Sequence, residues 1–165
     1  MKKLFSITTI AVCLLLFTNA IQSQTTQTKP DQVKLMLQAL GTWQGNVGKD
    51  TVQVRETKQY GKSYISNVSL DIKGIKSPSY ISNFIFDSKE SNFKGFILYA
   101  NGSYRTFIGL WTTEKKLSIN FVQDFKPEPV YGKVEFLLET PAKITVTSFN
   151  SDGIKTLEYK LNKVK

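Results

Sequence analysis

The side chain with the clearest potential for chemistry in this sequence is Arg105, which lies inside an otherwise apolar stretch, residues 104–111. It is in phase with Phe107 and Trp111, so the three side chains share one face if the stretch is a strand. If that face is turned inward, the guanidinium group can bind a carboxylate or a phosphate through two parallel hydrogen bonds. An outward arginine, or an ion pair at a rim, is the alternative interpretation.

A second group of candidates consists of aromatic side chains on the expected inward faces of strands. Such rings line apolar cavities, and tyrosine hydroxyls add polar contacts for a ligand. Dense packing of the core explains the same residues without any ligand. The candidates are Tyr64, Tyr80, Phe84, Phe86, Tyr99, Tyr104, Phe107, Phe121 and Tyr131. The other arginine, Arg55, is out of phase with Val52 and Val54 and is expected to face outward.

The composition removes many catalytic and metal-binding mechanisms. The 165 residues include no His, and the single cysteine, Cys13, lies in an N-terminal apolar run. This excludes Ser-His-Asp triads, His-dependent acid–base catalysis and His metal ligands, while tyrosine remains a conceivable haem ligand. Paired acid–base catalysis needs two neighbouring carboxyl groups, and the sequence places no two together. We therefore expect no catalytic site, no metal and no cofactor.

Strands must position the candidate residues, because nearly everything after Gly41 alternates in polarity and is divided by short turns. Asn101-Gly102 is the strongest turn signal, since both residues tolerate the backbone of a two-residue hairpin. The expected strands cover residues 42–47, 51–59, 62–71, 79–87, 92–100, 103–112, 116–125, 131–139, 142–149 and 154–163. Short turns join antiparallel neighbours, and closure removes the two edges of an open meander. We predict an all-β fold, an antiparallel up-and-down β-barrel of about ten strands.

One short helix is expected before the barrel, over residues 30–40, with Gly41 as its C-terminal cap. Its apolar side chains recur at helical spacing: Val33, Met36, Leu37 and Leu40. The middle hairpin, residues 93–111, is apolar on both faces, so its outer face requires a cover. The helix stripe is one candidate for that cover, and contact in a homodimer is the other.

The first 23 residues have the pattern of a secretory signal peptide. Lys2 and Lys3 precede an apolar run over residues 7–17, and Ala20 and Ser23 are small residues suited to cleavage. The run is too short for a bilayer-spanning helix, so a membrane anchor is the weaker interpretation. We expect a signal peptide over 1–23, a flexible leader over 24–29 and one barrel domain over 30–165, exported to the periplasm or beyond.

The net charge of +9 comes from basic residues that are spread along the chain. Nucleic-acid binding usually requires a concentrated basic face, so nucleic acid is not an expected partner.

The segment Gly41-Thr42-Trp43, directly after a short helical turn, resembles the opening of the calycins, the superfamily that includes lipocalins. The whole region 33–163 is similar to bacterial lipocalin-like domains of unknown function. The resemblance implies that Trp43, with Gly41, plugs the closed end of the barrel. It also implies an arginine from a late strand packed across that tryptophan. No arginine follows Arg105, and Lys160 is the expected substitute.

These observations favour an exported lipocalin-like protein that binds or carries a small, partly apolar ligand in the barrel cavity. An anionic lipid-like molecule would suit Arg105, with Tyr64, Tyr80, Phe84, Phe86, Tyr104, Phe107 and Phe121 around it. Two alternatives remain open. One is a non-catalytic envelope interaction module that uses the apolar middle hairpin, and the other is an enzyme without histidine.

Overall fold

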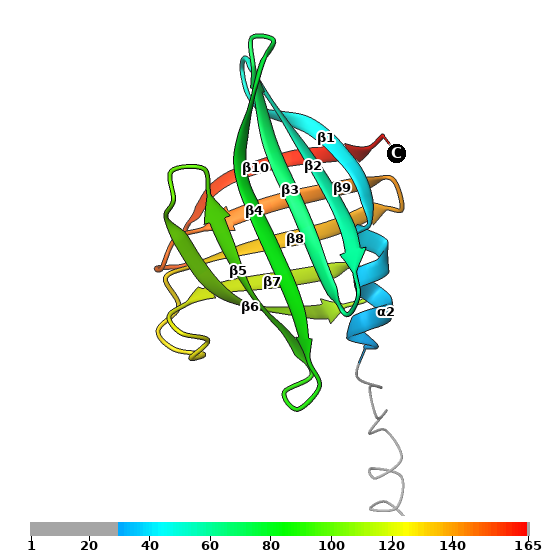
Figure 1. Cartoon of the computed structure of the whole chain (residues 1–165), viewed down its shortest axis with the longest axis vertical. Helices are drawn as coiled ribbons and strands as arrows, with labels where there is room; N and C mark the ends of the chain where they lie inside the picture. The colour runs from blue at the N-terminus through cyan, green and yellow to red at the C-terminus, as the bar shows by residue number, and fades with distance from the viewer. Residues whose placement is uncertain (1–29, 165) are drawn as a thin grey trace, which may run out of the picture.

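The computed structural model describes residues 30–164, which form a closed antiparallel barrel of ten strands with one short helix at its end (Figure 1). Every strand pairs with its neighbours in the chain, and the first strand closes the barrel against the last. The prediction of an all-β up-and-down barrel is confirmed. The predicted signal peptide and leader lie outside the described residues.

The strands follow the predicted ones closely because short turns divide them. They are β1 (Gly41–Gly48), β2 (Thr51–Tyr60), β3 (Ser63–Ile72), β4 (Ile75–Asp87), β5 (Asn92–Tyr99), β6 (Tyr104–Thr113), β7 (Lys116–Val122), β8 (Gly132–Thr140), β9 (Lys143–Phe149) and β10 (Lys155–Lys163). β4 starts earlier than predicted, since a register irregularity accommodates Pro78 within its pairing with β3. β7 ends earlier, because Asp124 and Phe125 adopt left-handed backbone angles of φ 51° and 60°.

The helical segment comprises α2 (Gln32–Met36) and a 3-10 turn, η1 (Leu37–Ala39). Asp31 caps α2, and its carboxylate accepts a hydrogen bond from the Lys34 backbone N–H at 3.0 Å. The predicted apolar stripe is wrong in part: Met36 is buried, but Val33 and Leu37 are exposed. The residues that face the barrel also include a polar one, Gln32, which is buried.

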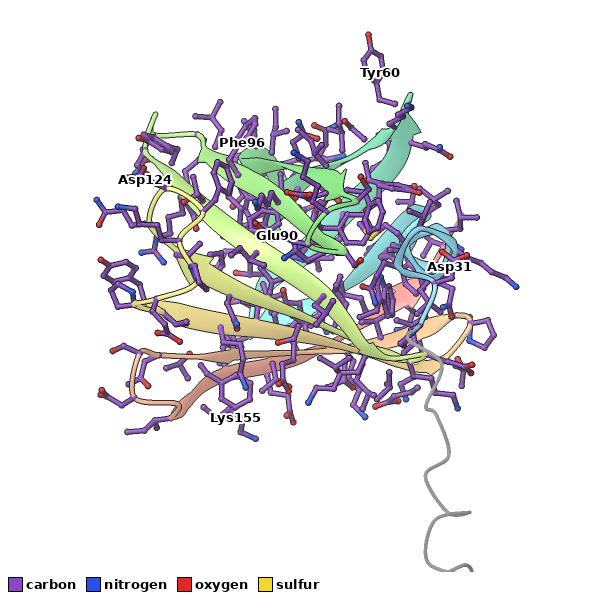
Figure 2. The ribbon with its side chains drawn as sticks, turned by 90° about the horizontal axis from the view of Figure 1, so that it is seen from below. Asp31, Tyr60, Glu90, Phe96, Asp124 and Lys155 are labelled. Carbon is purple, nitrogen blue, oxygen red and sulfur yellow. The ribbon has the colours of Figure 1, made fainter. Side chains whose placement is uncertain are left out.

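The outer face of the middle hairpin has no cover within residues 30–164, so the helix, one of the two candidate covers, is wrong; contact in a homodimer stays a prediction. α2 contacts β6 and lies at one end of the barrel, as Figure 1 shows, so it does not lie across the outer face of the hairpin. The outward side chains on β4, β5 and β6 remain exposed: Ile81, Ile85, Phe96, Leu98 and Leu110. Figure 2 shows Phe96 on the outer side of the barrel wall. We call these five residues the outer apolar face.

The two ends of the barrel differ. Asp31 marks the end that carries the helix, and Figure 2 places Asp124 and Lys155 at the opposite end. At the helix end of the core, Met36, Trp43 and Trp111 are almost fully buried. Within residues 30–164, no helix has the length and apolar character that a bilayer crossing requires.

Candidate functional site

A cavity of about 590 Å³ occupies the half of the barrel opposite the helix and opens at that end. Its volume lies in the range usual for small-molecule sites. One wall, from β5 to β8, is largely apolar, with Arg105 and Lys133 as its charged members; its apolar residues are Ile97, Phe107, Ile119, Phe121, Val134 and Phe136. Polar side chains gather across from it, in the polar wall on β2, β4, β10 and the last residue of β5, beside apolar residues such as Leu70 and Leu157: Gln53, Arg55, Tyr80, Ser82, Tyr159 and Tyr99. The cavity is therefore amphipathic across its width.

Arg55 occupies the centre of the polar wall. Strand register places Arg55 opposite Val68, Val68 opposite Tyr80, and Tyr80 opposite Tyr99, in one row across four strands. The Arg55 Nη2 group donates a hydrogen bond to the Tyr80 hydroxyl at 2.6 Å. Its Cζ atom lies 5.0 Å from the centre of the Phe136 ring, a distance suited to a cation–π contact.

Two further tyrosines complete the polar wall as neutral phenols. The Tyr159 hydroxyl donates a hydrogen bond to the Gln53 side-chain oxygen at 3.2 Å. Burial raises the pKa of both Tyr159 and Tyr99, because the ionised phenolate would lose hydration inside the barrel. Both phenols therefore stay protonated at neutral pH. The Tyr99 hydroxyl can donate a hydrogen bond to a ligand, whereas the Tyr159 proton is already donated to Gln53.

The floor of the cavity is formed by Arg55, Phe84 and Phe136. These three residues border the open cavity on one side and an enclosed space of about 30 Å³ on the other. The enclosed space is lined by Trp43 and the core of the helix end. A ligand in the cavity thus meets the Arg55 layer before it meets the barrel plug.

The buried plug follows the resemblance to calycins in outline. Trp43 is fully buried, and its indole N–H donates to the Ala39 carbonyl oxygen at 3.0 Å, which ties β1 to the helical segment. Gly41 starts β1 with φ 111°, a backbone angle that favours glycine. The expected role of Lys160 is wrong. Lys163 lies over the indole, with Nζ 5.1 Å from the ring centre, and Lys160 pairs with Glu139.

The structure divides the predicted ligand-binding residues into three groups. Tyr80, Phe84, Arg105, Phe107 and Phe121 line the cavity, together with Tyr99 and Tyr131.

Tyr64 and Phe86 face inward but pack against Phe93 in the core, with ring centres 6.0 Å and 5.4 Å from it. They do not border the cavity. The inward placement of Tyr104 is wrong, because its side chain is 69% exposed. Consecutive strand residues face opposite sides, so Tyr104 and Arg105 cannot both point inward.

Arg105 has the predicted phase but lies at the mouth, where it is exposed to solvent. Its Cζ atom lies 5.7 Å from the centre of the Phe121 ring. Tyr131 borders the same mouth from the segment before β8. A charge at this position is screened by water, so it attracts an anion less strongly than a buried charge does.

The sequence interpretation missed Arg55, which was expected outside and is inside. Its side chain is only 8% exposed. Val52 and Val54 suggested an apolar inner face for β2, but the inward residues of this strand are the polar Gln53, Arg55 and Thr57. The alternation of β2 was correct, and the assignment of its faces was reversed.

Neither arginine forms an ion pair with a carboxylate among residues 30–164. Every ion pair found among residues 30–164 uses a lysine. No Asp or Glu is among the described residues that line the cavity. No cluster of three Asp, Glu, His or Cys side chains suited to a metal ion occurs in the same part of the chain.

Comparison with known proteins adds no relative to this picture: no family model matches the chain, and no curated protein matches it at a significant level.

Proposed function

We propose that the protein binds a small, partly apolar molecule inside the barrel and carries it, in the manner of a lipocalin. The observation that supports this is the amphipathic cavity of about 590 Å³, open at one end and closed by an arginine layer and a tryptophan plug at the other. A ligand that is polar on one side and apolar on the other would satisfy both walls.

Binding without catalysis is part of this proposal. The described lining offers no carboxylate as a general base, and the buried tyrosines are held in their protonated form. Membership of the lipocalin-like barrels and export are supported by the Gly41-Thr42-Trp43 segment and by the signal-like first 23 residues. An exported carrier would collect its ligand outside the cytoplasm.

Native mass spectrometry of the protein purified from its own host tests the proposal. A co-purifying molecule of a few hundred daltons is expected. Ile97→Trp replaces an aliphatic side chain of the apolar wall by a bulky indole ring. It is expected to abolish both the retention of the co-purifying molecule and the binding of a neutral fluorescent hydrophobic probe.

Leu98→Trp is the matched control, because it adds the same ring to the outer face of the same strand. The carrier function is refuted if no molecule co-purifies and the probe does not bind. It is also refuted if both variants behave alike.

The outer apolar face favours a second candidate function, contact with a partner such as a second copy of the chain. A self-contact is compatible with its charge, since the lysine beside it, Lys94, already pairs with Asp87 and Glu90. Sedimentation of the protein at increasing concentration should then show dimers. Phe96→Lys is expected to abolish them, while Leu137→Lys, which alters an equally exposed residue of β8, leaves them intact. A wild-type monomer at all concentrations would contradict this candidate.

A further inference from the structure

The starting observation is a buried cation without a counterion. Arg55 is 8% exposed, and none of the described carboxylates pairs with it. Its hydrogen bond to Tyr80 and its contact with the Phe136 ring are made to neutral groups. A buried charge is costly unless an opposite charge accompanies it, so a protein keeps such a group where a ligand supplies that charge.

Several buried polar atoms of Arg55 and its neighbours have no hydrogen-bond partner among residues 30–164. Arg55 Nε, Gln53 Nε2 and Ser82 Oγ are buried and have no hydrogen-bond partner in this part of the chain. The Tyr80 hydroxyl accepts a hydrogen bond from Arg55, which leaves its own proton available to a ligand. Two strands, β2 and β4, therefore place the positive charge of Arg55 and the hydroxyl proton of Tyr80 in the lining of the cavity, with unpartnered polar atoms beside them. The complementary ligand group is an acceptor that carries negative charge.

We infer that Arg55 binds the carboxylate of the ligand at the cavity floor, so that the ligand is an apolar carboxylic acid held head-first. The inference rests on the proposed function and names the ligand class for the same cavity. Phe84 and Phe136 close the floor beneath the arginine. The apolar body must therefore extend away from the floor, along Phe107 and Ile119, toward the mouth.

The two arginines have different roles in this arrangement. Arg55 is desolvated and can form a short, charge-assisted pair with the carboxylate. Arg105 stands at the mouth in water, where it attracts an approaching anion but adds little to the affinity of the bound state. Arg105, which the sequence suggested as the binder of the acidic group, thus attracts the ligand to the mouth. Arg55, which was expected to face outward, binds the acidic group itself.

Competition against a neutral probe, N-phenyl-1-naphthylamine, tests the inference with decanoate and decanol, which share an apolar chain and differ in charge. The wild-type protein is expected to bind decanoate at least about 10-fold more tightly. Arg55→Met removes the charge and keeps an apolar side chain of similar reach. It is expected to weaken decanoate by about 10- to 100-fold and to leave decanol unchanged. Arg105→Met is the matched control, and its affinity for decanoate should change by less than about 3-fold.

Thermal unfolding without ligand gives a second readout. Arg55→Met is expected to unfold at a higher temperature than the wild type, because it removes an unpaired buried charge. A purely structural arginine, valued for its contacts to Tyr80 and Phe136, would make the same variant less stable. Arg55→Lys keeps the charge but lacks the planar guanidinium group. Its affinity for decanoate should lie between that of the wild type and that of Arg55→Met.

Each outcome separates this inference from the proposed function. If the wild type binds decanoate and decanol equally, the cavity is a binding site but the carboxylate assignment is wrong. If Arg55→Met weakens both ligands to the same extent, Arg55 only packs the floor. If neither ligand nor the probe binds, the carrier function itself fails. The acid-against-alcohol comparison uses the unaltered protein, so it is decisive even if a variant does not fold.

Discussion

Replacement of Gln32 by alanine tests how the short helix closes its end of the barrel. The pairing of β5 with β6 ends at Phe93 and Gly109, short of Trp111. There the Gln32 side chain forms the two backbone hydrogen bonds that a neighbouring strand would otherwise form. Its oxygen accepts from the Trp111 backbone N–H at 2.8 Å, and its Nε2 donates to the Trp111 carbonyl oxygen at 3.0 Å. Gln32 is only 3% exposed, so water does not reach these bonds readily.

The magnitude follows from the two backbone groups that would lose their partner. An unsatisfied buried polar group costs about 1–3 kcal/mol, and partial entry of water reduces the sum. We expect Gln32→Ala to lower the free energy of unfolding by about 2–3 kcal/mol. With a urea m-value of about 1.5 kcal/mol/M, the midpoint falls by about 1.3–2 M.

Equilibrium unfolding in urea, followed by tryptophan fluorescence, is the assay. Gln38→Ala is the matched control, because Gln38 donates an exposed hydrogen bond to the Glu114 carbonyl oxygen at 3.1 Å. Its loss should change stability by no more than about 0.5 kcal/mol. If the two variants prove equally stable, the helix does not act as a substitute strand and the reasoning is wrong.

Two further predictions concern the barrel wall. Gly95→Ala would drive a methyl group into the Asn83 carbonyl and the Phe107 ring, and should cost about 2–3 kcal/mol in urea unfolding. Gly109→Ala, whose nearest neighbour would lie at 3.7 Å, should be nearly neutral, and similar losses for both would contradict this account. Hydrogen bonds from Thr145, Lys160 and Lys143 lower the pKa of Glu139 from 4.5 to about 2. The stabilisation is therefore complete above about pH 4.5 and lost as the pH falls toward 2, so Glu139→Gln should flatten the pH dependence of stability across that window. Parallel wild-type and variant curves would refute the assignment.

The strands were predictable because their limits depend on local signals. Asn101-Gly102 lies at the hairpin between β5 and β6, and short turns separate the other strands. The end of β7 was missed, because no Gly or Pro precedes Pro127 to mark a turn after Val122. The chain leaves the strand there because two non-glycine residues, Asp124 and Phe125, adopt left-handed backbone angles.

The faces of the strands were harder to predict than the strands themselves. Periodicity separates two faces but identifies the inner one only when that face is the more apolar. This holds for β7, where Leu117 and Ile119 are buried, and fails for β2, where the inner face carries Arg55. A polar inner face is a property of a cavity, so the failure coincides with the candidate site. Tertiary contacts also decided which lysine covers Trp43, because that choice depends on the register of β10 against β1.

The pairing of β1 with β10 also bears on the order in which the barrel assembles. Within residues 30–164 this ladder contains Trp43 opposite Lys163 and Gln44 opposite Asn162, and it is shorter than the ladders between the other neighbouring strands. All other ladders join consecutive strands, whereas this one joins opposite ends of the described chain. Closing so long a loop carries the largest entropic cost for the fewest bonds. The local hairpins therefore form first and the ring closes last, and the amides of this ladder are the first to exchange when the native barrel opens.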